Sequence, residues 1–221
     1  MTDKSFNLTF IEEGLGAASI AACIVASPLI RSWYSKWGAS AEELKMPLPG
    51  DERVPNPSLE STRAITIQAP AADIWPWLVQ MGQGRGGLYS YERLENLIGC
   101  DIHNANRILP EHQNLKVGDK VLLHSGGYPA FEVAAIEPNQ ALILMGDESG
   151  EQAPPAVWVW IFYLNPIDED TTRLILRTRL DYEPNLGNVV IWRGFTDPIS
   201  FNMERKMLQG IKARVEAAAS G

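Results

Sequence analysis

The clearest alternation of apolar and polar side chains lies in TRAITIQA, residues 62–69. Ile65 and Ile67 fall on one face and Thr66 and Gln68 on the other, which is typical of a strand with one buried face. Five further runs rich in apolar residues follow in the second half of the chain, separated by turn signals such as SGG, EPNQ and DEDT. These runs are KVLLHS, AFEVAAI, ALILMG, VWVWIFYLNPI and TTRLILRTRL. We therefore predict six strands.

Two short helices are predicted between the first strand and the later five. Ile74, Trp77, Leu78 and Met81 recur three and four positions apart, which places them on one face of a helix. The run SYERLENLIG predicts a second helix, and Gly99 at its end suits the left-handed conformation of a helix C-terminus.

The glycines between these helices raise the question of a dinucleotide-binding motif. Gly82, Gly84 and Gly87 have the spacing G-x-G-x-x-G. In that motif a strand directly precedes the first glycine, so that the turn brings phosphates to the N-terminus of the next helix. Here a helix precedes the glycines and no strand–helix alternation follows. The sequence therefore favours a glycine-rich corner between two helices.

A long helix is predicted at the C-terminal end, with Asp197 as its cap and Pro198 in its first turn. Its apolar stripe consists of Ile199, Met203, Met207, Leu208, Ile211 and Val215. The charged residues expected off this stripe are Glu204, Arg205, Lys212 and Arg214. The order of elements predicts an α+β fold in which a curved antiparallel sheet wraps around the long helix. The space between them is where an apolar ligand would bind.

The first 36 residues hold an apolar segment without charge, residues 14–30. It is shorter than the about 20 residues that usually span a membrane, and it is rich in Gly, Ala and Ser. Trp33, with Arg31 and Lys36 beside it, suits the membrane interface and would leave the rest of the chain in the cytoplasm. Two interpretations stay open: an anchor on the inner face of the cell membrane, or a small-residue helix docked on the domain.

Residues 37–61 predict an extended linker with little regular structure, because prolines and a glycine crowd the run MPLPGDERVPNP. The folded domain is expected at residues 62–218.

Composition and charge exclude some classes of partner. A formal net charge of −8 argues against a broad basic surface for nucleic acid or anionic lipid. Cys23 and Cys100 form no C-x-x-C pair, and His103, His112 and His124 lack the spacing of a metal site. We therefore expect no metal and no cofactor, and we find no nucleophile–base motif.

Several motifs resemble the START-like, or SRPBCC, superfamily, most closely its bacterial members labelled polyketide cyclase or dehydrase-like. They are WGASAEE, LPGDE, TRAITIQAPAADIWPWLVQMGQGRGGLYSYERLENLIG, VGDKV, TTRLILRTR and MERKMLQGIKARVE. The resemblance covers about residues 37–218 and implies a helix-grip fold. Such relatives frequently carry an apolar N-terminal segment, which favours the membrane anchor over the docked helix.

The strand run VWVWIFYL is apolar on both faces, so both faces should be covered. One face is expected to border the cavity, and the other to meet the N-terminal segment, a partner or a membrane. The residues that we expect to bind the ligand are Trp77, Met81, Arg85, Tyr89, Tyr91, Trp158, Trp160, Phe162, Met203, Met207 and Ile211. For the aromatic residues and methionines, a plain core role remains the alternative.

Arg85 and a row of strand arginines each allow two roles. Arg85 could bind a carboxylate or phosphate head group at the cavity mouth, or it could serve a helix end or a carboxylate nearby. Arg173, Arg177 and Arg179 alternate on one strand face. Facing inward, this row would make the cavity prefer anions, whereas the favoured interpretation is a solvated outer face paired with acidic neighbours.

The function predicted from these observations is binding of a small hydrophobic or amphipathic molecule, lipid or polyketide-like, in an internal cavity. One alternative is a cyclase or dehydratase acting on a polyketide-like substrate, with Tyr89, Tyr91 and His103 as candidate acids or bases. A second alternative is a membrane-tethered interaction module whose own Trp and Met side chains fill the cavity. Enzyme activity is the less favoured interpretation.

Overall fold

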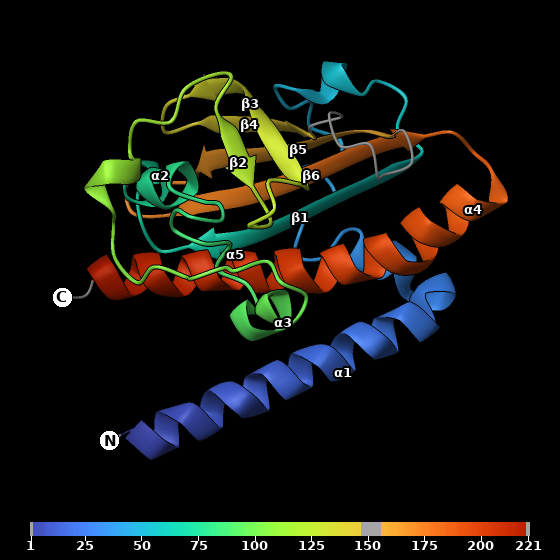
Figure 1. Cartoon of the computed structure of the whole chain (residues 1–221). Coiled ribbons are helices and arrows are strands. Elements are labelled where there is room, and N and C mark those ends of the chain that lie inside the picture. The colour runs from blue at the N-terminus through green and yellow to red at the C-terminus, as the bar shows by residue number, and fades with distance from the viewer. Residues whose placement is uncertain (1, 147–155, 220–221) are drawn as a thin grey trace.

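The computed structural model describes residues 2–146 and 156–219, with residues 2–10 as backbone only (Figure 1). In chain order the helices and strands are α1 (Thr2–Tyr34), β1 (Leu59–Ile67), α2 (Ala71–Val79), α3 (Glu92–Leu97), β2 (Lys120–Leu122), β3 (Ala130–Glu137), β4 (Ala141–Gly146), β5 (Ala156–Pro166), β6 (Thr172–Tyr182), α4 (Leu186–Val189) and α5 (Asp197–Ala219). Short 3-10 turns lie at Asp51–Arg53 and Pro110–His112, and a π-helical turn, Val190–Thr196, joins α4 to α5.

The strands form one antiparallel sheet in the order β1-β6-β5-β4-β3-β2. The chain meanders from β2 to β6, and β1, which comes first in the sequence, completes the edge beyond β6. β5 and β6 pair along their whole length. α5 lies along one face of the sheet, and α1 lies on the far side of α5 (Figure 1). The predicted α+β helix-grip fold is therefore confirmed, including the strands and the two short helices after β1.

The main core lies between α5, α2 and the inner face of the sheet, by which we mean the face toward α5. Phe162 and Leu176 from the sheet and Leu208 and Ile211 from α5 are fully buried there. Periodicity predicted this core correctly, because residues two apart on a strand and three or four apart on a helix share one face.

The start of α5 differs from the predicted cap. Asp197 has helical dihedral angles, φ −60° and ψ −48°, because α4 and the π-helical turn already lead into it. Its carboxylate does not cap the helix. It accepts hydrogen bonds from Arg31 Nε at 2.9 Å and from Tyr34 Oη at 3.0 Å, both in α1. Pro198 has no N–H to donate, which explains a change of helix type at this point.

The outer face of the sheet is covered by the proline-rich segment that follows α1. Leu48 and Val54 of this segment pack in one cluster with Ile143 and Ile161 of β4 and β5. The segment has little regular structure, as its prolines predict. It is nevertheless packed against the domain, because the outward apolar residues of β5 need a cover.

The row of arginines lies on this outer face and is paired with acidic residues, as expected. Arg173 pairs with Glu43 at 2.7 Å, and Arg179 pairs with Glu60 at 3.0 Å. Arg177 pairs with Asp51 at 2.6 Å but is buried rather than solvated, because the proline-rich segment lies over it. The row therefore fastens that segment to the sheet.

α1 docks along α5, which is one of the two arrangements that the sequence left open. Ser19 Oγ donates to Asn202 Oδ1 of α5 at 2.6 Å. The carboxylate of Glu13 accepts the backbone N–H groups of Arg93 and Leu94 at the start of α3, each at 3.3 Å. Polar contacts thus tie α1 to both α5 and α3.

The residues just after α1 extend the sheet. The carbonyl oxygens of Ser35 and Trp37 accept the backbone N–H groups of Thr62 at 2.8 Å and Ala64 at 3.1 Å. Both donors belong to β1, the edge strand, so residues 35–37 cover that edge.

Candidate functional site

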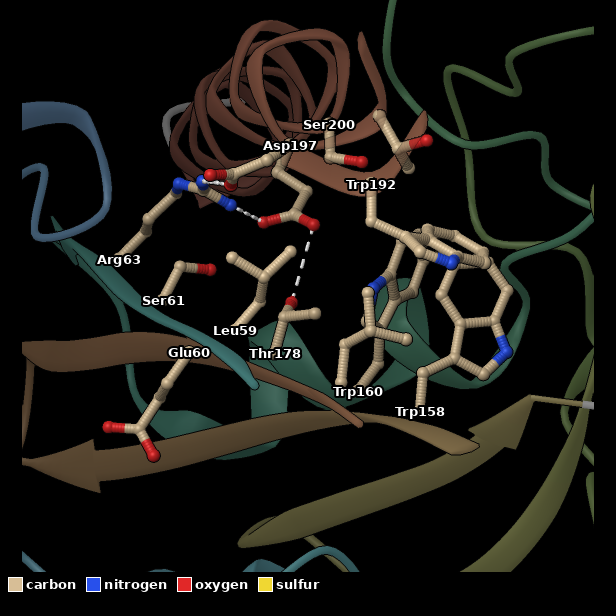
Figure 2. A pocket seen from close by; sticks show the side chains of 13 residues that line it. Leu59, Glu60, Ser61, Arg63, Trp158, Trp160, Thr178, Trp192, Asp197 and Ser200 are labelled. Carbon is tan, nitrogen blue, oxygen red and sulfur yellow. Dashed lines mark hydrogen bonds and ion pairs between the residues drawn. The ribbon is translucent and has the colours of Figure 1, made fainter. Parts of the chain in front are cut away.

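A pocket lies where the N-terminal part of α5 crosses β1, β6 and β5 (Figure 2). The register explains the grouping, because Ser61 of β1, Thr178 of β6 and Trp160 of β5 lie directly opposite one another on neighbouring strands. The residues that line the pocket are Leu59, Glu60, Ser61, Arg63, Trp158, Trp160, Thr178, Leu180, Trp192, Thr196, Asp197, Ser200 and Glu204.

Three tryptophans form one wall of this pocket (Figure 2). The ring centroids of Trp158 and Trp192 are 6.2 Å apart. Phe131 supports the wall from β3, with its ring centroid 4.8 Å from that of Trp158 and 4.5 Å from that of Trp160. Because large aromatic rings offer broad apolar faces, the wall suits a flat apolar molecule.

A buried ion pair faces the tryptophans. Arg63 Nη1 donates to Glu204 Oε2, and Thr178 Oγ1 donates to Glu204 Oε1 at 3.3 Å. Arg63 Nε also donates to the carbonyl oxygen of Tyr34 at 3.2 Å, and its guanidinium carbon lies 5.4 Å from the ring centroid of Phe201. Residues of β1, β6, α5 and α1 therefore hold the pair in one position.

Asp197 connects the pocket to α1. Its Oδ1 lies 3.8 Å from Arg63 Nη2, whereas its Oδ2 accepts the hydrogen bonds from Arg31 and Tyr34 described above. One carboxylate thus faces both the pocket arginine and the N-terminal helix.

Both residues of the ion pair are buried, and burial is the largest influence on the pKa of Glu204. The exposed fractions of Arg63 and Glu204 are 0% and 1%. Burial raises the pKa of the Glu204 carboxyl, and the charge of Arg63 acts in the opposite direction. Removing one partner from such a pair leaves an uncompensated buried charge, which is strongly destabilising.

Two buried donors on the pocket wall have no hydrogen-bond acceptor among the described residues. They are Nε1 of Trp192 and Nη2 of Arg63, of which the latter keeps the ion pair with Asp197 Oδ1 at 3.8 Å. Trp192 is only 8% exposed. An unmet buried donor costs about 1–3 kcal/mol, so the site favours a molecule that brings an acceptor.

The pocket is small in this conformation, at about 30 Å³, which is room for roughly one water molecule. Trp158, one of the lining residues, packs closely over Gly146 of β4. A Cβ atom on Gly146 would lie 1.2 Å from Trp158 Nε1, so the indole occupies the space that a side chain at that position would need. Trp158 is half-buried, whereas Trp160 and Trp192 are buried. It is therefore the most exposed ring of the wall.

Of the residues predicted to bind the ligand, Trp158 and Trp160 line this pocket. Trp77, Met81, Tyr89, Phe162, Met207 and Ile211 lie in the main core, and Met203 lies against Ser90. None of these residues is among those that line the pocket.

Arg85 contacts the end of a helix. Its Nη2 donates to the carbonyl oxygens of Val79, at the end of α2, and His112, at 3.0 and 2.9 Å. It makes neither of the ion pairs considered with Glu92 and Glu95 among the described contacts. These contacts fit the helix-end role, which is one of the two roles that the sequence allows.

The three candidate acids or bases all lie outside the pocket. Tyr89 Oη donates to the carbonyl oxygen of Trp77 at 3.0 Å, and burial raises the pKa of Tyr89 to about 12. Tyr91 is half-buried beside α1, where its ring would block any side chain larger than hydrogen at Gly16. His103 is exposed and contacts Asp101 at 3.1 Å. No group of His, Cys, Asp and Glu among the described residues could hold a metal ion.

Sequence reasoning missed most of the polar side of the pocket. Arg63 shares its strand face with Ile65 and Ile67, so a charged residue at an inward position was the available signal. Glu204 was expected off the apolar stripe, and this was wrong. It lies three residues after Phe201 and four before Leu208, both buried, and it is buried with them.

No protein-family model and no curated protein matches the sequence. Solved structures similar to this chain include a point mutant of norcoclaurine synthase from Thalictrum flavum in complex with a transition-state analogue, 16% identical, with 73% of this chain and 96% of that chain covered and a TM-score of 0.45. A conserved protein from Geobacillus kaustophilus is 14% identical, with 72% and 97% covered and a TM-score of 0.46. A START superfamily protein from Mycobacterium smegmatis is 12% identical, with 72% and 98% covered and a TM-score of 0.44.

Proposed function

We propose that this protein binds a small amphipathic molecule, with a flat apolar body and an oxygen acceptor, in the pocket between α5 and the sheet. The observation that carries the proposal is the pairing of three tryptophans with a buried arginine in one pocket. Polyketide-like molecules belong to this chemical class.

The two sides of the pocket would bind different parts of the ligand. The rings of Trp158, Trp160 and Trp192 take up the apolar body, and its burial supplies about 25 cal/mol per Å² before ordering costs. Arg63 Nη2 and Trp192 Nε1 are donors without a hydrogen bond, and we expect the oxygen of the ligand to accept from one of them. A carbonyl or hydroxyl oxygen satisfies donors that are otherwise unmet, so it adds both affinity and orientation.

Entry of the ligand requires a larger pocket than the about 30 Å³ described above. Drug-sized ligands occupy pockets of about 300 Å³ or more. We expect Trp158 to rotate away from Gly146 when the ligand enters, because its ring is the half-buried member of the wall.

The same small volume supports one competing function. If Trp158 keeps its position, the tryptophans fill the pocket themselves and the protein is an interaction module without a ligand. The cyclase alternative gains no support from Tyr89, Tyr91 or His103, since none of them lines the pocket.

Isothermal titration calorimetry with two probes tests the proposal. Naphthalene supplies a flat apolar body, and 2-naphthol adds one hydroxyl oxygen to it. We expect 2-naphthol to bind about tenfold tighter than naphthalene, which corresponds to about 1.4 kcal/mol. We expect W192F, which keeps a ring but removes the Nε1 donor, to abolish most of that preference.

W77F is the matched control, since it makes the same change at a buried tryptophan outside the pocket. It should leave the preference for 2-naphthol unchanged. Equal affinity for both probes in the unmodified protein would contradict the role of the donors. The absence of any binding heat, together with native mass spectrometry showing no retained molecule, would favour the module without a ligand.

A further inference from the structure

We propose that the outward face of α1 binds the surface of a lipid bilayer, with the helix lying along the membrane rather than across it. The outward face is the side of α1 that points away from α5. Its exposed large residues are Ile11, Leu15, Val25, Leu29 and Trp33.

The outward side of α1 is apolar, whereas its inward side combines polar side chains with apolar contacts of Cys23 and Ile30 near Phe201. Ser19, Ser27, Arg31 and Tyr34 point toward the domain and make hydrogen bonds there or with one another. The outward side instead carries large apolar side chains, among them Val25 and Leu29, at 84% and 86% exposed. A surface helix in water normally turns its apolar side inward. Polar groups directed inward and apolar groups outward are what a lipid surrounding favours.

The breadth of the outward face favours lipid over a second copy of the chain. Positions 11, 15, 18, 22, 25 and 29 have the spacing of a coiled-coil seam. Such a seam is normally flanked by charged residues that set the pairing of two helices. Here Glu12 is the one charged residue among the exposed flanking positions, and it pairs with Lys206 of α5; the others, Gly14, Ala21 and Pro28, carry no charge.

Both ends of the outward face fit the boundary between lipid and water. Trp33 is 56% exposed at one end, with Lys36 exposed soon after it. Tryptophan and basic residues gather at this depth of a membrane. At the other end Glu12 pairs with Lys206 of α5, so its charge is directed toward the domain.

The contacts of α1 determine its orientation. Within residues 2–146 and 156–219, α1 is the one helix with a stretch long and apolar enough to cross a membrane, Ile11–Tyr34, although core helices and signal sequences meet the same criteria. Contacts with α5 run from Glu12 to Arg31, a distance of about 29 Å at 1.5 Å per residue. A helix that crossed the bilayer would have to give them up, whereas a helix lying along the membrane keeps them all.

The charge of the protein predicts which bilayer it prefers. The formal net charge is −8, so binding to anionic lipid would meet repulsion. The outward face has no charge between residues 14 and 30. We therefore expect binding to zwitterionic lipid, driven by apolar contact and not weakened by salt.

Flotation of the full chain with phosphatidylcholine vesicles tests the proposal. We expect the unmodified protein to float with the vesicles at about 0.05 M and about 0.5 M NaCl alike. The double variant V25K/L29K should lower the bound fraction about tenfold or more, because both lysines enter the apolar contact. Circular dichroism should show the fold unchanged, since both positions are exposed.

The matched control is V117K/I167K, which makes the same change at two exposed apolar residues on loops near the sheet. It should float like the unmodified protein. Equal flotation of V25K/L29K would overturn the proposal. Light scattering that shows a dimer which V25K/L29K converts to a monomer, without vesicle binding, would assign the face to a second copy. Resistance of the bound protein to carbonate extraction would contradict an orientation along the membrane.

Discussion

The two faces of the sheet both bury an arginine beside carboxylates, yet they use it differently. On the outer face all three nitrogens of Arg177 make hydrogen bonds, to Thr62, Asp51 and two backbone carbonyl oxygens. On the inner face Arg63 leaves Nη2 without a hydrogen bond to any described residue, beside an aromatic pocket. The difference teaches that a buried arginine whose nitrogens all make hydrogen bonds has a structural role. An unmet donor at a pocket indicates a binding role.

The largest effect is expected from R63M. This change leaves the Glu204 carboxylate buried with only Thr178 to donate to it. Breaking a buried pair in this way costs about 3–5 kcal/mol, so urea denaturation at pH 7 should show a loss of that size. The double variant R63M/E204M should recover most of it, because no unpaired charge remains. A loss below about 1 kcal/mol would contradict the view that the pair is a buried unit.

A buried carboxyl with two acidic neighbours extends the comparison. Burial, with Glu13 and Glu92 nearby, raises the pKa of Glu95 from 4.5 to about 7, and its Oε2 has no hydrogen-bond partner among the described residues. Between these two pH values the folded protein holds a proton that the unfolded chain has lost. Stability therefore falls as pH rises through this window, by up to about 3 kcal/mol, and the loss is complete above the folded pKa.

The variant E95Q carries no such proton and should lack this part of the pH dependence. Urea denaturation at several pH values between the two pKa values measures it, and the difference between the variant and the unmodified protein isolates Glu95 from Glu204. Parallel curves for the two proteins would refute the assignment.

A smaller effect is expected from R177K on the outer face. Lysine keeps the charge but cannot reproduce the planar set of donors, so a loss of about 1–2 kcal/mol in the free energy of unfolding is expected. The affinity for 2-naphthol should stay the same, because Arg177 lies on the opposite face from the pocket. A change in that affinity would contradict the assignment of a structural role to Arg177 and of ligand binding to the inner face.

The smallest effect is expected at the exposed pair of Glu12 and Lys206. Glu12 is more than half exposed, so E12Q should change the free energy of unfolding by about 0.5 kcal/mol or less. Thermal unfolding of the two proteins side by side measures this. A loss as large as that of R177K would mean that exposed pairs, rather than buried polar groups such as Tyr34, hold α1 in place.

The fold could be predicted because its signals are local and repeated. The alternation in β1 and the helical spacing in α2 are set by which side chains share a face, and Gly99 has the left-handed φ of 86° that its position required. The cap at Asp197 could not be predicted in the same way. Its surroundings depend on the π-helical turn before it and on Arg31, which is far away in the sequence.

The pocket could be predicted only in part. Trp158 and Trp160 were identified because alternation on one strand reveals them. Arg63 and Glu204 were missed because each looks like a surface charge until the other is placed opposite it. Their sequence separation is 141 residues, so the pairing emerges only in the folded chain.

The two hydrogen bonds between residues 35–37 and β1 bear on how far the chain can be shortened. An uncovered edge strand is a template for pairing with the same strand of another molecule, which leads to aggregation. A chain shortened to begin at Gly38 would lose that cover as well as the carbonyl oxygen that holds Arg63 Nε. For expression of a soluble shorter form, the segment from Tyr34 to Trp37 therefore belongs with the sheet rather than with the helix before it.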